Sequence, residues 1–402
     1  MAPDKASESS DHGPHICIIA GEPSGEHMGA GLLAALIEET GGKVRFSGIG
    51  GVEMAKAGRS HGFESFLPME DLSIAGIFEI IPHIPRSFRH LNETARRIKK
   101  LSPDVVVTID SSAFSFRLGK KLKGGSATLV HYVAPAVWAW RPRRAKMIAR
   151  FLDHLLMIFP FEAPYFRKWG LACTFIGHPI AEMDMDKGDG PGFRSTHGMG
   201  ESQPLLCVLP GSRQAEVKRL LPVFSDVLAR LKRDIPDLAV VVPTVATVAD
   251  TVRAATASWP VPVTVTEGMG AKRDAFAASH VALAASGTVT SELTVAGVPM
   301  VIVYRLAWLS ALVIRLMIKI PYVSVVNLAL GREIAPEFLQ GRCRADLITG
   351  ALLPLMLDPD ARRNQIEGLA EVAEIFKGGD KPSSQQAAEV ILQLVADKNE
   401  AD

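Results

Sequence analysis

The chain reads HICIIAGEPSGEHMGAGLLAALIEE from His15 to Glu39, an apolar run, a glycine-containing loop and a helical pattern. We expect a buried strand over residues 15–20, a turn at 21–25 and a helix over 28–39. The same order follows downstream, where a Val/Ile run at 104–109 ends on Asp110 and a helical segment continues to Lys123. Residues 127–132 and 154–159 look like further buried strands. Uniformly apolar strands of this kind favour a parallel sheet covered on both faces.

The second half of the chain repeats this pattern. A strand at 205–209 leads into the turn Pro210-Gly211-Ser212-Arg213, and a helix follows over 216–233. Further strands are predicted at 238–242, 261–266, 281–285 and 300–304. Two successive strand–helix arrays predict an α/β protein with two doubly wound, Rossmann-like domains.

The expected organisation has five parts. Residues 1–14 form a disordered tail, and 15–182 form the first Rossmann-like domain. A linker rich in Gly, Asp and Pro covers 183–203, and 204–345 form the second Rossmann-like domain. Residues 346–402 form closing helices, the last of them amphipathic over 383–394.

The composition of the chain excludes several classes of protein. The 402 residues carry a net charge of +1, so no global field would attract nucleic acid. The four cysteines are widely spaced, which argues against a zinc ribbon or a disulfide scaffold and fits a reducing compartment. No run of about 18 apolar residues predicts a membrane span, and the N-terminus lacks the pattern of a signal peptide.

Two turns of the second domain are candidates for an anion site. Residues 284–292 place Ser286-Gly287-Thr288 between a strand and a helix, where free amides could bind a diphosphate. Glu292 lies one helical turn further on, within reach of ribose hydroxyls. Arg213, next to Ser212, could stabilise negative charge on a departing diphosphate. An ordinary capped helix and a surface arginine are the alternative interpretations.

In the first domain, Asp110 is the candidate base because it follows a strand directly. Helix capping is an equally good interpretation of an aspartate at such a junction. The loop with Glu22 and Ser24 belongs to the same edge, although it lacks the phosphate-loop pattern Gly-x-x-x-x-Gly-Lys.

Aromatic and basic residues follow the strand at 127–132. Tyr132, Trp138 and Arg141 could contact a sugar and a phosphate, with core packing as the alternative. The acidic pair Asp184 and Asp186 resembles a metal-binding Asp-x-Asp, but its place in the predicted linker makes a metal site a weak hypothesis.

Two apolar segments could lie on a bilayer. The first, residues 74–84, is followed by Arg86 and Arg89, and the second covers residues 308–320. A buried helix or a dimer contact is the alternative for either segment. Membrane contact in the first would come from Ile77, Phe78, Ile80, Ile81 and Ile84.

Taken together, these blocks resemble the lipid A disaccharide synthase family, glycosyltransferases of the GT-B type, over residues 15–394. The resemblance is carried by Gly-Glu-x-Ser-Gly at 21–25, Gly-Ile-Gly-Gly at 48–51, Asp110, residues 134–141, Pro-Phe-Glu at 160–162, Gly-His-Pro at 177–179, residues 209–213, Ser-Gly-Thr at 286–288, Tyr-Val-Ser at 322–324, Asn327, Gly-Arg-Glu at 331–333 and Gln340.

The resemblance implies a hexosyltransferase that acts with inversion. UDP-2,3-diacylglucosamine would donate its sugar to the 6-hydroxyl of 2,3-diacylglucosamine 1-phosphate, giving a β-1,6 disaccharide 1-phosphate and UDP. It implies Asp110 as base and Arg213, Glu292, Asn327 and Gln340 on the nucleotide side. It further implies no metal or other cofactor, a homodimer that exchanges C-terminal segments, and a cytoplasmic protein attached peripherally to the inner membrane through residues 74–84.

The chain departs from the family pattern beside the base. The family usually has Ile-Asp-x-Pro-Asp-Phe-Asn, whereas this chain has Ile-Asp-Ser-Ser-Ala-Phe-Ser at 109–115. Tyr-Val-Ser-Pro-Ser has become Tyr-Val-Ala-Pro-Ala at 132–136. A UDP-sugar 2-epimerase and a decayed lipid-binding protein are the alternative functions. A dehydrogenase is disfavoured because no Gly-x-Gly-x-x-Gly follows the first strand of either half.

Overall fold

The computed structural model describes residues 13–72, 80–140, 143–306 and 321–401. The chain forms two compact units, unit 1 from Met1–Pro179 with Lys377–Asp402 and unit 2 from Ile180–Phe376. Each unit contains a six-stranded sheet in which every pair of neighbouring strands is parallel. The prediction of two Rossmann-like α/β domains is therefore confirmed.

Unit 1 alternates strands and helices from its start. Its elements are β1 (His15–Ala20), α1 (Pro23–Glu39), β2 (Arg45–Ile49), α2 (Val52–Gly58), η1 (Arg59–His61), η2 (Met69–Asp71), α3 (Ile80–Leu101), β3 (Val105–Ile109), α4 (Ser112–Leu122), β4 (Thr128–Tyr132), α5 (Val137–Trp140), α6 (Arg143–Ile148), β5 (His154–Met157), η3 (Pro160–Glu162), α7 (Ala163–Arg167), β6 (Ala172–Phe175) and α17 (Ser383–Ala401).

Unit 2 follows the same plan. Its elements are η4 (Pro179–Glu182, which starts at the boundary), α8 (Gly190–Thr196), β7 (Leu205–Leu209), α9 (Gln214–Asp234), β8 (Ala239–Thr244), α10 (Ala249–Thr256), β9 (Val263–Glu267), α11 (Met269–Ala278), β10 (Val281–Ala285), α12 (Thr288–Val295), β11 (Met300–Tyr304), α14 (Val325–Leu330), β12 (Glu337–Leu339), η5 (Gln340–Arg342), α15 (Ala345–Leu357) and α16 (Pro359–Lys377).

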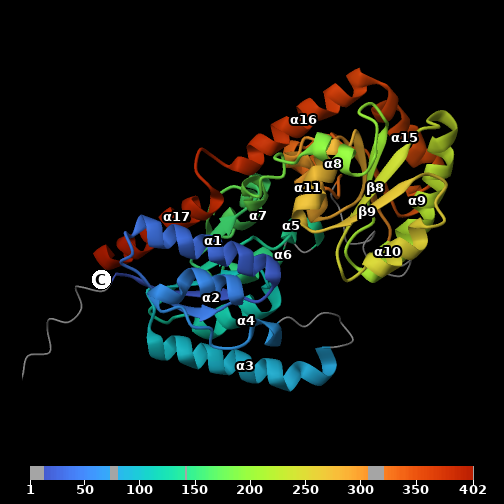
Figure 1. The fold of residues 1–402 in the computed structure, drawn as a ribbon. Helices are drawn as coiled ribbons and strands as arrows, with labels where there is room; N and C mark the ends of the chain where they lie inside the picture. Colours follow the sequence, from blue (N-terminus) through green and yellow to red (C-terminus); the bar gives the residue numbers. More distant parts are fainter. Residues whose placement is uncertain (1–12, 73–79, 141–142, 307–320, 402) are drawn as a thin grey trace, which may run out of the picture. The chain divides into compact units, whose positions relative to one another are not determined.

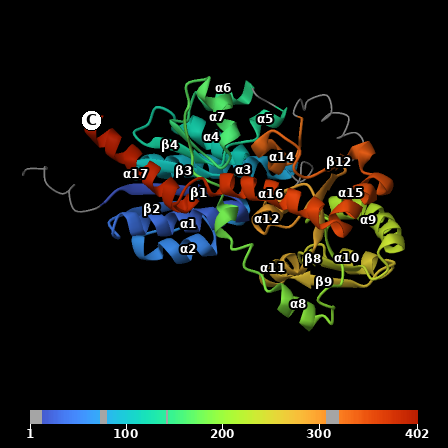
Figure 2. The same cartoon turned by 90° about the horizontal axis from the view of Figure 1, so that it is seen from above.

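Helices cover both faces of the unit 1 sheet. Side chains of successive strand residues point to opposite faces, so Cys17 and Ile19 join one core cluster with Leu91 of α3 and Phe116 of α4. On the other face, α1 packs on β1 and β3 and buries Leu32, Leu33 and Leu36. Figure 2 shows α1 and α2 on one side of β1 and β3, with α4 on the other.

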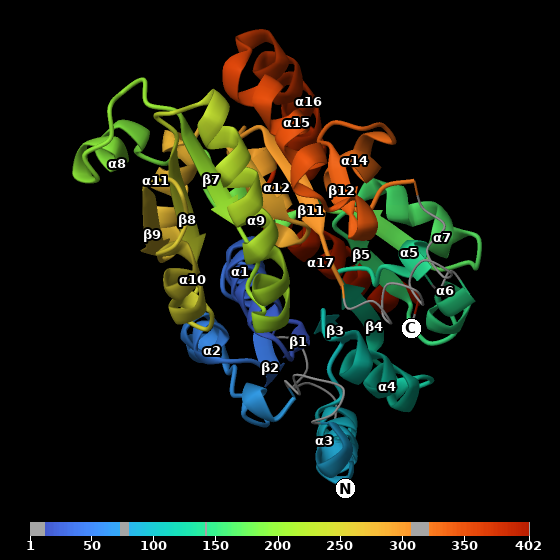
Figure 3. The same ribbon diagram turned by 90° about the vertical axis from the view of Figure 1, so that its right-hand side faces the viewer.

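Unit 2 is built in the same way. Strand residues such as Val208, Val240 and Leu283 pack in one cluster with the apolar face of α9, which buries Val217, Leu220 and further residues along its length. Helices α10 and α15 contribute to the same cluster. Figure 3 shows α9 running beside the strands β7, β8 and β9.

Strand order determines where ligands can bind. The first sheet has the order β2-β1-β3-β4-β5-β6, so the direction in which successive strands are added to the sheet reverses between β1 and β3. The second has the order β12-β11-β10-β7-β8-β9, with the corresponding reversal between β7 and β10. Open α/β sheets bind ligands beyond the carboxyl ends of strands at such reversals. The loops after β1, β3, β7 and β10 are therefore the candidate ligand-binding loops.

The last helix of the chain belongs to the first unit. α17 packs along α1, where Gln385 donates a hydrogen bond to Glu39 at 2.6 Å, and Lys398 donates to the carbonyl of Ser126. Figure 1 shows α17 lying beside α1. Within this one chain, the closing helix thus packs back onto the N-terminal sheet.

Residues 183–203, expected to be a linker, contain the short helix α8. The Asp189 side chain caps this helix by accepting from the Gly192 amide at 2.8 Å. Arg194 is 8% exposed, and its guanidinium donates to the carbonyl of Ala278 at the end of α11. This segment is consequently a packed part of unit 2.

Two predictions from composition can be compared with the structure. Cys17, Cys173, Cys207 and Cys343 are all unpaired and buried, as expected for small apolar side chains. In the part of the chain that the structure describes, no helix is long and apolar enough to cross a membrane. The predicted tail falls mainly on residues 1–12, outside the described residues.

Candidate functional site

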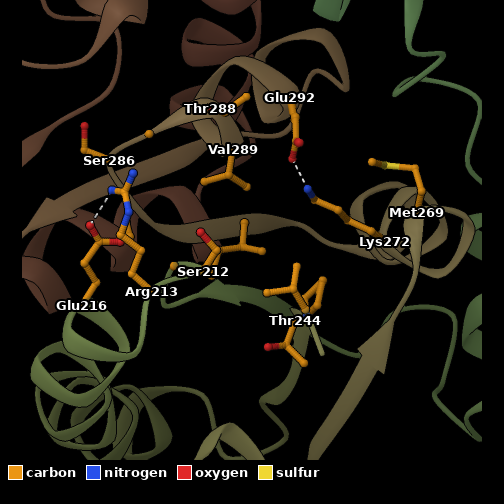
Figure 4. A pocket seen from close by; sticks show the side chains of 16 residues that line it. Ser212, Arg213, Glu216, Thr244, Met269, Lys272, Ser286, Thr288, Val289 and Glu292 are labelled. Carbon is orange, nitrogen blue, oxygen red and sulfur yellow. Dashed lines mark hydrogen bonds and ion pairs between the residues drawn. The ribbon is translucent and has the colours of Figure 1, made fainter. Parts of the chain in front are cut away.

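A cavity of about 460 Å³ opens at the strand reversal of unit 2. The volume lies in the range of small-molecule sites. Its lining comes from the loops after β7, β8, β9 and β10 and comprises Leu209, Gly211, Ser212, Arg213, Glu216, Pro243, Thr244, Val245, Met269, Lys272, Ala285, Ser286, Gly287, Thr288, Val289 and Glu292. Five residues predicted for the nucleotide side, Ser212, Arg213, Gly287, Thr288 and Glu292, meet here (Figure 4).

The start of α12 supplies backbone donors to this cavity. Gly287 is the N-cap residue in an extended conformation, and no side chain caps the helix. The first amides of a helix have no partner within the helix, and the helix dipole favours an anion beside them. This end of the cavity can therefore bind a phosphate group.

The opposite wall depends on a glycine. Gly211 has φ +105°, and a Cβ atom there would lie 3.1 Å from Oε2 of Glu216. Any side chain would be strained by the left-handed backbone and would approach that carboxylate closely. Glycine thus lets the β7–α9 turn pass beside Glu216 at the cavity wall.

Two ion pairs face the cavity (Figure 4). Arg213 contacts Glu216 at 3.1 Å, and the Arg213 side chain is 79% exposed. Lys272 contacts Glu292, whose side chain is only 9% exposed. In the first pair only Arg213 is exposed, since Glu216 is 16% exposed, whereas in the second pair both side chains are largely buried. Arg213 can therefore leave its partner at a lower cost than Lys272.

Two residues implied for the nucleotide side lie elsewhere. Asn327 is fully buried, and its amide bonds the backbone of Ile334 and Ala335 and the carboxylate of Glu337. Gln340 accepts a hydrogen bond from the Leu306 amide at 3.2 Å. Neither residue lines the cavity, because both side chains are engaged in holding the loops around β12.

In unit 1 the reversal brings Asp110 and Ser24 together. The Ser24 hydroxyl, from the first turn of α1, donates to Oδ2 of Asp110 at 3.1 Å. Asp110 does not cap α4, because the N-cap residue is Ser111 and no side chain bonds the first amides. Asp110 and Ser111 have φ values of +50° and +41°, a conformation that costs energy outside glycine. Strain of this kind is typical of functional sites.

The other acceptor-side candidates differ in accessibility. Glu22 is exposed at the N-cap position of α1, two residues before Ser24. Tyr132 is 1% exposed, so its ring is part of the core and does not offer a surface to a sugar. Trp138 lies half-buried on α5, and Arg141 falls outside the described residues.

An aromatic cluster surrounds a buried carboxyl group beyond β4, β5 and β6. The indole of Trp138 packs edge-on against Phe161 at 5.3 Å, and Phe159 contacts both Phe161 and His178. The Trp138 Nε1–H donates to Oε1 of Glu162 at 3.3 Å, while Oε2 of Glu162 has no hydrogen-bond partner among the described residues. Burial raises the pKa of Glu162 to about 8. Glu162 is thus protonated at neutral pH.

This pKa makes the stability of unit 1 depend on pH. Between about pH 4.5 and 8 the folded state keeps a proton on Glu162 that the unfolded chain releases, so stability falls as pH rises through this window. We expect Glu162→Gln to remove this contribution. The free energy of unfolding of the variant, minus that of the native protein, should increase by on the order of 3 kcal/mol between pH 5 and pH 8. Urea unfolding at both pH values measures the difference.

The exposed Glu64 of the same unit provides the control. Glu64→Gln should leave the pH dependence unchanged. Parallel stability curves for the native protein and Glu162→Gln would show that Glu162 is ionised in the folded state.

The metal hypothesis gains no support from local contacts. Asp184 forms an ion pair with Lys187 at 2.7 Å. Among the described residues, no three His, Cys, Asp or Glu side chains are grouped to hold a metal.

The predicted membrane contacts cannot be compared with side-chain positions. Ile77 and Phe78 lie outside the described residues, as does the second apolar segment at 308–320. Ile80, Ile81 and Ile84 belong to the first turns of α3, where only the backbone is described.

Sequence reasoning missed three charged residues that the structure places at these sites. Lys272 lies beyond the carboxyl end of β9, where ligands of open α/β sheets bind, so its position in the sequence was a usable signal. Glu216 belongs to the same turn of α9 as Arg213. Glu162 was part of a quoted motif, but its burial could not be read from the sequence.

Similarity to known proteins extends over nearly the whole chain. A family model described as lipid-A-disaccharide synthetase matches residues 16–393. The lipid-A-disaccharide synthase of Rhodospirillum centenum is 48% identical over 389 residues, which cover 96% of each chain. That of Paramagnetospirillum magneticum is 43% identical and covers 94% of this chain and 97% of its own.

Solved structures with low sequence identity share the fold. A UDP-GlcNAc 2-epimerase from Neisseria meningitidis bound to UDP-GlcNAc gives a TM-score of 0.61 at 9% identity and covers 95% of this chain and 100% of its own. Anabaena Alr3699/HepE in complex with UDP and glucose gives 0.55 at 12% identity and covers 94% and 100%.

Proposed function

Because this chain belongs to the lipid-A-disaccharide synthase family and is therefore a glycosyltransferase of lipid A biosynthesis, we propose that the unit 2 cavity binds the UDP part of the donor and that Asp110 is the catalytic base. The donor is UDP-2,3-diacylglucosamine, and the acceptor is 2,3-diacylglucosamine 1-phosphate. The observation that carries the proposal is the meeting of Ser212, Arg213, Gly287, Thr288 and Glu292 around one cavity.

The donor diphosphate lies at the start of α12. The two ion pairs leave the charged side chains of the cavity with no net charge, so the amides beside Gly287 and Thr288 provide the first attraction for an anion. Arg213 then exchanges Glu216 for the diphosphate, because an exposed pair is worth less than about 1 kcal/mol. A guanidinium is suited to phosphate oxygens.

Asp110 removes the proton from the 6-hydroxyl of the acceptor. The hydroxyl oxygen attacks the anomeric carbon, the bond from that carbon to the diphosphate oxygen breaks, and UDP leaves with the bonding electrons. One displacement inverts the anomeric configuration and gives the β-1,6 linkage. Ser24 orients the carboxylate by its hydrogen bond to Oδ2.

Product analysis by mass spectrometry tests this function. Purified protein with both lipid substrates should give the disaccharide 1-phosphate and one UDP per disaccharide. Release of UDP from the donor alone would indicate hydrolysis, and formation of a manno epimer from UDP-GlcNAc would indicate an epimerase. Absence of all three products would indicate a binding protein.

A cationic face on unit 1 supports attachment to the cytoplasmic face of the inner membrane. Helix α3 carries one acidic residue, Glu93, and its later turns expose Arg89, Arg96, Lys99 and Lys100. The neighbouring helix α4 has no acidic residue, and it exposes Arg117, Lys120 and Lys121. Clustered cations are attracted to anionic lipids, which would bring residues 74–84 to the surface of the bilayer.

We expect Arg96→Gln/Lys99→Gln/Lys100→Gln to weaken binding to vesicles of anionic phospholipid on the order of 100-fold, at about 1 kcal/mol for each cation. Vesicle co-sedimentation at low salt measures the affinity. The matched control neutralises three exposed cations of α9, Lys218, Arg230 and Arg233. Equal losses in the two triple variants would exclude α3 as the contact.

The homodimer implied by the resemblance is also a proposal. Helix α17 belongs to unit 1 and covers α1, but in the chain it follows α16 of unit 2. It is therefore the element that a second copy would exchange. The molecular mass in solution, measured by light scattering, tests the dimer.

A further inference from the structure

Lys272 and Glu292 form the more buried of the two ion pairs in the cavity. Their side chains are 22% and 9% exposed, against 79% for Arg213. The Lys272 ammonium also lies 5.8 Å from the ring centre of Phe276, one turn further along α11. Lys272 is therefore held by two partners on two helices.

The two pairs divide the cavity into two ends. Figure 4 shows Arg213 with Glu216 on one side of the opening and Lys272 with Glu292 on the other, with Ser212 and Val289 between them. Ser286 lies on the Arg213 side and Met269 on the Lys272 side. If the diphosphate occupies the Arg213 end, the nucleoside extends toward Lys272.

We propose that Lys272 is a positioning residue for the nucleoside, which it serves by holding the Glu292 carboxylate aimed at the ribose hydroxyls. This inference rests on the proposed binding of UDP in this cavity. A carboxylate is a strong acceptor for a hydroxyl donor, and without the cation that holds it this side chain could turn away from the ribose. Lys272 thus acts on the ribose through Glu292.

The consequence is selectivity for ribose over deoxyribose. A hydrogen bond to a charged group is worth about 1.5–3 kcal/mol, so the native protein should bind UDP ~10–100-fold more tightly than 2′-deoxy-UDP or 3′-deoxy-UDP. A lysine that only stabilised the fold would affect the three ligands equally.

Calorimetric titration of the full chain with the three nucleotides tests the proposal. Lys272→Met should lower the preference for UDP to within about threefold of unity, and Lys272→Arg should keep most of it. Lys272→Met/Glu292→Gln leaves no buried charge in this pair and should also lose the preference while it stays folded. Lys218→Met, on the exposed surface of α9, is the control and should retain it.

The outcomes separate the two proposals. If the native protein does not bind UDP, the assignment of the cavity fails. If it binds UDP but Lys272→Met and the double variant keep the native preference, or if the native protein has no preference, the role of Lys272 is overturned. An equal loss of affinity for all three nucleotides would also overturn it.

Discussion

Asp110→Asn should lower kcat by ~10²–10⁴ and leave the Kd for UDP within about twofold of the native value. An amide cannot take the proton of the acceptor hydroxyl, although its oxygen can still accept the hydrogen bond from Ser24. Asparagine tolerates the left-handed backbone at φ +50° about as well as aspartate, so the variant should fold. Steady-state turnover and calorimetric titration with UDP measure the two quantities.

The same strand offers the control. Asp104 lies directly before β3 and Asp110 directly after it, so the two carboxylates are at opposite ends of the strand. Oδ2 of Asp104 accepts a hydrogen bond from the His15 amide at 2.8 Å. Asp104→Asn should keep kcat within about twofold of the native value. Full activity in Asp110→Asn would mean that another group takes the proton.

Arg213→Ala should lower kcat by ~10²–10³, because removing one group that stabilises developing charge typically costs this much. The ion pair with Glu216 spans one turn at the surface, so its loss should change the free energy of unfolding by less than about 1 kcal/mol. A large kinetic effect with an unchanged Tm would identify contact with the leaving group. Single-turnover measurement with saturating donor provides the rate.

Two further variants make this result specific. Arg213→Lys keeps a charge but loses the fork of donors, so we expect a smaller loss than with alanine. Lys218→Ala removes an exposed cation from the same helix and should be silent. If Arg213→Ala and Lys218→Ala gave equal rates, Arg213 would have no part in stabilising UDP.

The central strands of both sheets and the edge strand β9 were predictable, whereas the other three edge strands were not. The runs at 105–107 and 281–285 are apolar throughout because both faces of a central strand are covered. The sequence analysis missed β2, β6 and β12, each of which lies at the edge of its sheet. β12 has only three residues, and β2 begins with the exposed Arg45. Short or partly exposed strands leave a weak pattern.

Those residues of the candidate site that lie in turns directly after predicted strands could be predicted from the sequence. Turns that follow strands converge at a strand reversal, which is why Ser212 and Gly287, both predicted for the nucleotide side, line one cavity. Partners that come from separate elements could not be inferred in this way. The pairing of Lys272 with Glu292 and the bond from Trp138 to Glu162 depend on how helices pack.

Asn327 and Gln340 belong to the blocks that carry the resemblance, yet neither lines the cavity. Their positions match the family blocks, but four hydrogen bonds tie Asn327 to its own loop. A residue shared by relatives can hold a loop in shape without touching a ligand. In unit 2, the matched residues that do line the cavity are Ser212, Arg213, Gly287, Thr288 and Glu292.

The packing of α17 on α1 has a practical consequence for dividing the protein into fragments. Unit 2 is one uninterrupted stretch, Ile180–Phe376, inserted within unit 1, so it can be expressed by itself from a single reading frame. A fragment that stops at Pro179 would lack the helix that covers α1 and would expose apolar surface to solvent. Unit 1 should therefore be produced with residues 377–402 joined to residue 179 through a short artificial loop.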